Sequence, residues 1–233
     1  MPIENEYNSL MKTITFDRPD GKAIAGYYAE PASGSNAPGV VVIQEWWGLN
    51  DQIKGMADRL AAAGYRAIVP DLYRGKVAVE AQEAQHLMGS MNFGDAASQD
   101  IRGAVQYLKK DSARVGVTGF CMGGALTLLA AVNAPEADAA ASWYGFPPLE
   151  YIDTAKIKIP LQGHFSKEDA YFPIAGLDEL EKKLKAGDVK FEFYRYDAPH
   201  AFANDAGHNY RRDAAELAWG RMIEFFGRTL KGN

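Results

Sequence analysis

Cysteine and histidine are scarce in this sequence. The chain of 233 residues has one cysteine, Cys121, so it cannot form an internal disulfide. This fits a reducing compartment, and we expect a cytoplasmic protein. The four histidines and the cysteine match no metal-ligand spacing, and no metal site is expected. No G-x-G-x-x-G follows a predicted strand and no glycine-rich turn ends in Lys-Ser/Thr, so we expect no cofactor.

Long apolar runs and an excess of positive charge are also missing. No window has about 18 consecutive apolar residues, so no membrane span is predicted. Residues 1–6 have neither a basic start nor an apolar run, so no signal peptide is predicted. The net charge of −5 argues against nucleic acid or an anionic membrane as a partner. The length suits one α/β domain over residues 1–233, which we expect to be a monomer acting on a small molecule.

Apolar stretches of strand length alternate with stretches of helical periodicity. The predicted strands are 12–16, 23–29, 39–44, 65–69, 115–118, 139–143, 157–162 and 189–194. The predicted helices are 51–63, 79–89, 94–109, 125–131, 174–186 and 209–230. Asn50 is expected to cap the first helix and Gly64 to end it. The pattern predicts a mainly parallel sheet covered on both faces, with chemistry at the carboxyl ends of its strands.

Two further expectations concern the ends of this pattern. The first two strands flank Asp20-Gly21, a hairpin signal, and a loop over 31–37 follows them. The last helix is expected to bury Leu217, Met222, Phe225 and Phe226 against the sheet.

The cysteine lies in the segment Gly119-Phe-Cys-Met-Gly-Gly124, between a β-branched stretch and a helix-forming stretch. This is the strand, tight turn and helix of the G-x-S-x-G elbow of α/β-hydrolases, with Cys121 in the serine position. Gly119 and Gly123 fit because a Cβ would clash where two chain segments pass closely. The alternative is a small buried core cysteine, but the elbow pattern favours a nucleophile.

A base and an orienting acid are needed beside such a nucleophile. His200 follows the last predicted strand, and Asp169 follows the strand before it. The order nucleophile, acid, histidine is that of α/β-hydrolases, so we predict Cys121 as nucleophile, His200 as base and Asp169 as its acid. The alternatives are Glu168 as the acid and a locally bonded turn role for His200. His164, on the same predicted loop as Asp169, is expected to be structural.

Glu45, Trp46 and Trp47 follow the buried strand 39–44 at its carboxyl end. In a functional interpretation, the backbone N–H groups of Trp46 and Met122 form an oxyanion hole. The alternative for the adjacent Trp46 and Trp47 is ordinary core packing. Glu45 faces the elbow in this arrangement, and its alternative is a simple salt bridge at a strand end.

Together these motifs resemble the dienelactone hydrolase family (carboxymethylenebutenolidases) over nearly the whole chain. The matching motifs are Gln44-Glu45-Trp46-Trp47-Gly48, Pro70-Asp71-Leu72-Tyr73, Gly119-Phe-Cys-Met-Gly-Gly124, Trp143-Tyr144-Gly145, Asp169 and His200-Ala-Phe202. The resemblance implies an α/β-hydrolase fold. It also implies hydrolysis of dienelactone to maleylacetate, or of a related lactone or small ester, through an acyl-enzyme on cysteine.

The resemblance assigns roles to further residues. It implies that Glu45 holds the proton of the resting thiol and that Arg74 helps to hold a substrate carboxylate. The alternative for Arg74 is a solvent-exposed side chain. The remaining residues expected to bind substrate are Trp47, Tyr144, Phe172, Phe202 and Asn204.

Asn204 departs from the family pattern. Family enzymes that act on dienelactone have an arginine four residues after the histidine, where this chain has a neutral amide. We therefore expect weak discrimination between anionic and neutral substrates. The alternatives are a general carboxylesterase without a preference for anions and a non-catalytic binding or redox-sensing relative.

Overall fold

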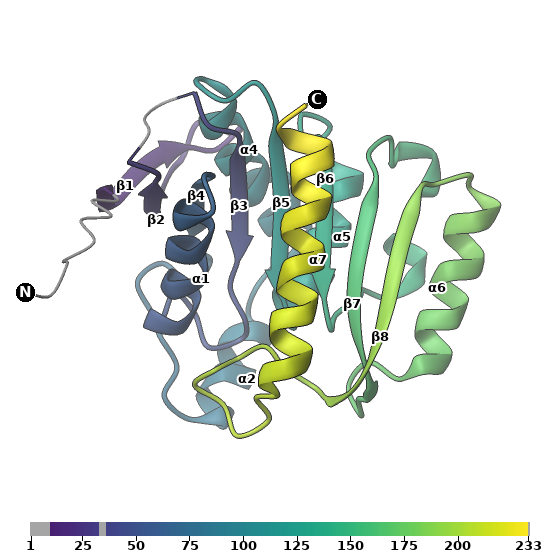
Figure 1. Ribbon diagram of the computed structural model, residues 1–233. Coiled ribbons are helices and arrows are strands. Elements are labelled where there is room, and N and C mark those ends of the chain that lie inside the picture. The colour runs from purple at the N-terminus through teal and green to yellow at the C-terminus, as the bar shows by residue number, and fades with distance from the viewer. Residues whose placement is uncertain (1–9, 33–35, 233) are drawn as a thin grey trace, which may run out of the picture.

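The computed structural model describes residues 10–32 and 36–232 (Figure 1). Residues 1–6, in which we predicted no signal peptide, and part of the predicted loop over 31–37 lie outside the described residues. The strands, in chain order, are β1 (Leu10–Asp17), β2 (Ala23–Glu30), β3 (Gly39–Ile43), β4 (Arg66–Pro70), β5 (Val115–Phe120), β6 (Ala139–Trp143), β7 (Leu161–Glu168) and β8 (Phe191–Pro199).

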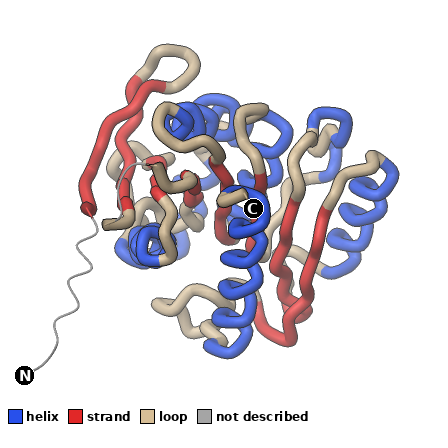
Figure 2. Tube along the Cα trace, turned by 45° about the horizontal axis from the view of Figure 1, so that its top comes forward, coloured by secondary structure: helices blue, strands red, loops and turns tan. Residues whose placement is uncertain are grey.

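The eight strands form one sheet in the order β1-β2-β4-β3-β5-β6-β7-β8. The β1–β2 and β2–β4 pairs are antiparallel, and every other pair is parallel. The predicted hairpin is confirmed, with Gly21 in its turn at a φ of 81°. Figure 2 shows this hairpin at one edge of the sheet. The observed architecture confirms the predicted α/β-hydrolase fold class.

Helices cover both faces of the sheet. They are α1 (Asp51–Ala62), α2 (Ala81–Gly89), α3 (Phe93–Asp95), the π-helical η1 (Ala96–Ile101), α4 (Arg102–Lys109), α5 (Met122–Asn133), the 3₁₀ turns η2 (Leu149–Tyr151) and η3 (Thr154–Lys156), α6 (Ile174–Ala186) and α7 (Arg212–Leu230). Apolar residues of α1 and α7 pack on one face, and those of α4, α5 and α6 pack on the other. In Figure 1, α1 and α7 lie in front of the sheet, and α4 and α5 lie behind it.

The local signals read from the sequence explain how the central elements form. β3, a run of Gly and β-branched residues, is buried at all of its positions, as a strand covered on both faces requires. The side chain of Asn50 accepts a hydrogen bond from the Ile53 N–H at 3.1 Å and caps α1. Gly64 follows α1 with a φ of 88°, which glycine adopts without steric cost. The predictions for both residues are confirmed.

The strand predicted over 157–162 is wrong in its position, because β7 begins at Leu161 and continues to Glu168. His164, expected in a loop, therefore lies in mid-strand and is fully buried. The strand tolerates this imidazole because Tyr196 Oη and Gln162 Oε1 each lie 2.9 Å from one of its nitrogens. The structural role expected for His164 agrees with these contacts.

Two helix predictions also need correction. Leu217 is 52% exposed, because the buried stripe of α7 runs through Ala215, Ala218 and Met222 and leaves Leu217 to one side. The helix expected over 94–109 contains the π-helical turn η1. Asp100, in that turn, is buried and pairs with the guanidinium groups of Arg18 and Arg74.

Within residues 10–32 and 36–232, none of the helices combines the length and the apolar character that crossing a lipid bilayer demands. The same part of the chain contains no group of three or more His, Cys, Asp or Glu side chains placed to hold a metal ion.

Candidate active site

Four chemically active side chains meet at the carboxyl ends of parallel strands. Glu45 follows β3, Cys121 directly follows β5, Asp169 directly follows β7, and His200 directly follows β8. Because parallel strands end at the same edge of the sheet, residues far apart in the sequence come together there.

Cys121 occupies a strained turn between β5 and α5. Its φ of 56° is unusual for a residue with a Cβ and costs about 1–3 kcal/mol. The turn is held by the Cys121 N–H, which donates to the Trp143 carbonyl at 3.0 Å, and by the Cys121 carbonyl, which accepts from Gly124. A Cβ on Gly119 would overlap the Gly123 carbonyl, and a Cβ on Gly123 would overlap the Ile43 carbonyl. The predicted elbow is therefore present, with both glycines required by close backbone contacts.

A chain of close contacts runs from the thiol through an imidazole to a carboxylate. The Sγ of Cys121 lies 3.2 Å from Nε2 of His200, and Nδ1 of His200 lies 2.7 Å from Oδ2 of Asp169. The structure thus brings together all three residues of the predicted triad. Glu168, the rival acid, is exposed.

Hydrogen bonds with the backbone fix the positions of Asp169 and His200. Oδ1 of Asp169 accepts hydrogen bonds from the N–H groups of Tyr171 and Phe172 at 2.9 and 3.0 Å, which turns Oδ2 toward His200. The amide of Asn209 donates to the carbonyl of His200 at 2.9 Å. A register shift at the end of β7, next to Asp169, matches the frequent placement of strand irregularities beside active sites.

Aromatic rings surround the imidazole of His200. The centroids of Tyr144, Tyr171 and Phe172 lie 5.3, 5.1 and 5.6 Å from that of His200, and the Phe172 ring is stacked on it. These rings restrict the orientation of the imidazole and reduce its contact with water.

Glu45 is buried close to the thiol and is held by two neutral donors. The amide of Asn204 donates to Oε2 at 2.7 Å, and the hydroxyl of Tyr144 donates to Oε1 at 3.3 Å. The Asn204 Oδ1 accepts from the Ala206 N–H, which fixes which end of the amide faces Glu45. Burial raises the pKa of Glu45 above its ordinary value, although the two hydrogen bonds and the charge of His200 act in the opposite direction.

The thiol environment favours the neutral form. Burial raises the pKa of Cys121 most, and the negative charge of Glu45 raises it further, while a hydrogen bond from the Met122 N–H lowers it. In this geometry the sulfur faces His200, and both Glu45 oxygens are engaged by Asn204 and Tyr144. The contacts therefore differ from the implied arrangement in which Glu45 holds the thiol proton.

A cavity of about 610 Å³ opens over Cys121. Its lining includes the predicted residues Glu45, Trp46, Trp47, Met122, Phe172, His200 and Asn204. Trp46 and Trp47 are half-buried, so they serve as cavity wall as well as packing. The cavity is also lined by residues that were not predicted from the sequence, namely Gln85, Met88, Tyr171 and His208. The position of Tyr171 beside Asp169 was the one available signal.

Three residues predicted to bind substrate do not line this cavity, namely Phe202, Tyr144 and Arg74. Phe202 is fully buried among Trp143, Tyr144 and other core rings. Tyr144 is buried behind Glu45, where its hydroxyl is used in the hydrogen bond described above. Neither lines the cavity, because the core packing of their rings turns them away from it.

Arg74 also lies outside the cavity lining, which corrects the expectation that it holds a substrate carboxylate. Its guanidinium makes two contacts of 2.9 and 3.0 Å with Asp100 and donates to the carbonyl of Asp71 at 2.9 Å. The ion pair with a buried carboxylate holds the side chain in place.

The sequence matches the model of the dienelactone hydrolase family over residues 24–230. It is 36% identical to "Protein usf" of Aquifex pyrophilus, with 93% of this chain and 98% of that protein covered. It is 33% identical to a Methylorubrum extorquens protein named "Putative carboxymethylenebutenolidase", with 96% and 83% covered. A crystal structure of a Klebsiella pneumoniae protein described as "Putative Dienelactone Hydrolase" superposes with a TM-score of 0.81 at 25% identity, covering 94% of this chain and 99% of that one.

Proposed function

The chain belongs to the dienelactone hydrolase family and is a hydrolase of ester or lactone bonds, and from this premise we propose that it works through an acyl-enzyme on Cys121. The observation that carries the proposal is the chain of contacts from Cys121 through His200 to Asp169 at the floor of a cavity. This is the arrangement that activates a thiol by an adjacent, oriented base.

Acylation begins with the neutral thiol. As Sγ attacks the substrate carbonyl carbon, His200 Nε2 takes the thiol proton and an S–C bond forms. Asp169 keeps the imidazole oriented and stabilises its charged form. His200 then gives the proton to the departing alkoxide as the C–O bond breaks, and a lactone opens at this step.

The oxyanion of the tetrahedral intermediate is held by backbone N–H groups. Met122 begins α5 directly after Cys121, and its N–H lowers the pKa of the Cys121 thiol through a hydrogen bond. We assign it as one donor and the N–H of Trp46, on the facing loop, as the other.

In deacylation His200 again acts first as a base and then as an acid, with water in place of the thiol as the nucleophile. His200 removes a proton from water, which attacks the thioester carbon. Collapse of the second tetrahedral intermediate breaks the S–C bond, releases the carboxylic acid product, and returns a proton to the sulfur.

Neutral lactones and esters are the substrates that fit this site best. The residues lining the cavity, all within the described part of the chain, include neither lysine nor arginine. Among these lining residues Glu45 is the acidic one. A substrate carboxylate would gain no charge-assisted hydrogen bond from a lysine or arginine there and would lie beside the carboxyl group of Glu45.

Reaction with p-nitrophenyl acetate tests the proposal. We expect a burst of p-nitrophenol followed by a slower phase, and a mass increase of one acetyl group on Cys121. Cys121→Ala should lose activity by at least about 10³-fold, since a covalent nucleophile is removed. Activity of that variant within tenfold of wild type, with an intact thermal transition, would exclude Cys121 as nucleophile.

A further inference from the structure

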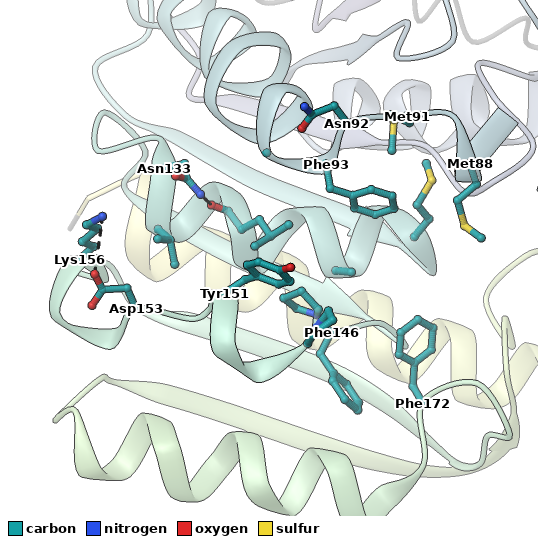
Figure 3. Close-up of a pocket in the computed structure, with 17 residues that line it drawn as sticks. Met88, Met91, Asn92, Phe93, Asn133, Phe146, Tyr151, Asp153, Lys156 and Phe172 are labelled. Atoms are coloured by element: carbon teal, nitrogen blue, oxygen red, sulfur yellow. Dashed lines mark hydrogen bonds and ion pairs between the residues drawn. The ribbon is translucent and has the colours of Figure 1, made fainter.

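A second, larger cavity lies beside the first and has no part in the triad. Its volume is about 890 Å³, and 17 residues line it (Figure 3). This volume is at the upper end of the range of small-molecule sites.

The two cavities share part of their walls. Met88, Met122 and Phe172 line both of them. Met122 directly follows Cys121, and Phe172 stacks on His200. The second cavity therefore begins at residues that adjoin the thiol and the imidazole.

Helix α5 sets the direction and length of this cavity. Met122, Ala125, Leu129 and Val132 line it and follow one face of the helix at intervals of three and four residues. From Met122 to Val132 the helix rises about 15 Å. The space extends away from the elbow along the helix, and in Figure 3 Met88 and Phe172 lie at one end and Asn133, Asp153 and Lys156 at the other.

The lining of this cavity is mainly apolar. Methionine and phenylalanine side chains from several elements face it, among them Met88, Met91, Phe93 and Phe146. The charged lining residues are Asp153 and Lys156, which pair with each other at 3.6 Å at the far end. An open apolar surface of this size is unfavourable in water and is typical of a binding site. Methionines adapt to ligands of varied shape.

We propose that this cavity binds the apolar substituent of the substrate, so that the enzyme prefers esters or lactones carrying a long alkyl or aryl group. The inference rests on the proposed function, because it places the substituent relative to the acylated Cys121. The substituent lies along α5, and the scissile carbonyl lies at the Met122 end.

Two series of neutral esters test this placement. In one, p-nitrophenyl esters carry acyl chains from acetyl to octanoyl, and in the other, acetates carry alcohols of increasing length. We expect kcat/KM to rise by up to about fourfold per methylene in one of the two series. The series that responds identifies the acyl or the alkoxy side as the occupant.

Variants away from the triad locate the effect. Val132→Trp fills the far half of the cavity, and Met91→Glu places a carboxylate in its wall without adding bulk. Both should reduce kcat/KM for the longest ester by at least tenfold and leave the acetyl ester within twofold. Val79→Trp, at a position that is 84% exposed and outside both linings, is the matched control and should change neither.

The outcomes separate this inference from the proposed function. If p-nitrophenyl acetate acylates Cys121 but kcat/KM is flat in both series, or if Met91→Glu and Val132→Trp leave the chain-length dependence unchanged, the cavity is not the substituent site. If no ester acylates Cys121, the proposed function itself fails.

Discussion

The amide of Asn204 donates a hydrogen bond of 2.7 Å to Glu45, a residue 159 positions away in the sequence. The bond joins the loop after β8 to the end of β3, directly beside the thiol. Because this donor is neutral, it supplies no opposite charge to Glu45, and burial keeps the pKa of Glu45 raised.

Asn204→Arg should give this site a preference for anionic substrates. A guanidinium would supply a charge-assisted hydrogen bond where the amide supplies a neutral one, a gain of about 1 kcal/mol or more. We expect kcat/KM for a carboxylate-bearing lactone, relative to its neutral counterpart, to rise about five- to tenfold. Asn204→Gln, neutral but longer, is the control. A wild type that already prefers the anion a hundredfold would contradict the reasoning.

Glu45→Gln should make Cys121 more reactive toward iodoacetamide at neutral pH. The negative charge of Glu45 raises the pKa of Cys121, so removing that charge lowers this pKa and increases the thiolate fraction. The alkylation rate should rise about tenfold for each pKa unit lost. Glu216→Gln, at an exposed position, should have no effect. Rapid alkylation of the wild type that Glu45→Gln does not change would show that the thiolate is already present.

Asp169→Asn should disable the base while leaving the fold intact. An asparagine amide that donates to Nδ1 of His200 would place the imidazole proton on Nε2, so the ring could no longer accept the thiol proton. We expect kcat to fall by about 10³–10⁴-fold. Glu168→Gln, which changes the neighbouring rival acid, should retain nearly full activity. If Glu168→Gln lost activity and Asp169→Asn kept it, Glu168 would be the acid that orients His200.

His164 should make the fold sensitive to acid. Burial lowers its pKa from 6.5 to about 3, so the unfolded chain binds this proton before the folded protein does. The contribution of neutral His164 to the free energy of unfolding is therefore fully present above pH about 6.5. It is lost progressively as the pH falls toward 3. The melting temperature of His164→Gln should depend less on pH than that of the wild type in this window. His86→Gln, at an exposed site, is the control, and equal slopes in all three proteins would exclude His164 as the cause.

The parts of the site that the sequence predicted are those with local signals. The elbow is specified by two glycines whose close contacts leave no room for a Cβ, between a buried strand and a helix. Asp169 and His200 could be placed because strands and helices alternate regularly, which puts the residue after each parallel strand at one edge.

Several of the predictions that failed concern side-chain direction. Phe202 lies two residues from His200, yet its ring packs in the core, while Asn204 reaches Glu45. Arg74 turns to Asp100, whose burial depends on a π-helical turn that no sequence pattern indicated. Leu217 was misassigned for a similar reason, since the phase of α7 is set by the sheet that it covers. Such orientations depend on tertiary contacts, not on local spacing.

The assembly of the site from four strand ends has a consequence for refolding. Cys121 and His200 are 79 residues apart, and Glu45 and Asn204 are 159 apart. The two pairs meet only when β3 and β5 are adjacent and β6, β7 and β8 have been added in order on the far side of β5. Contacts of this sequence separation form late, because loop closure must precede them. Hydrolytic activity should therefore return after secondary structure during refolding and report the completed sheet.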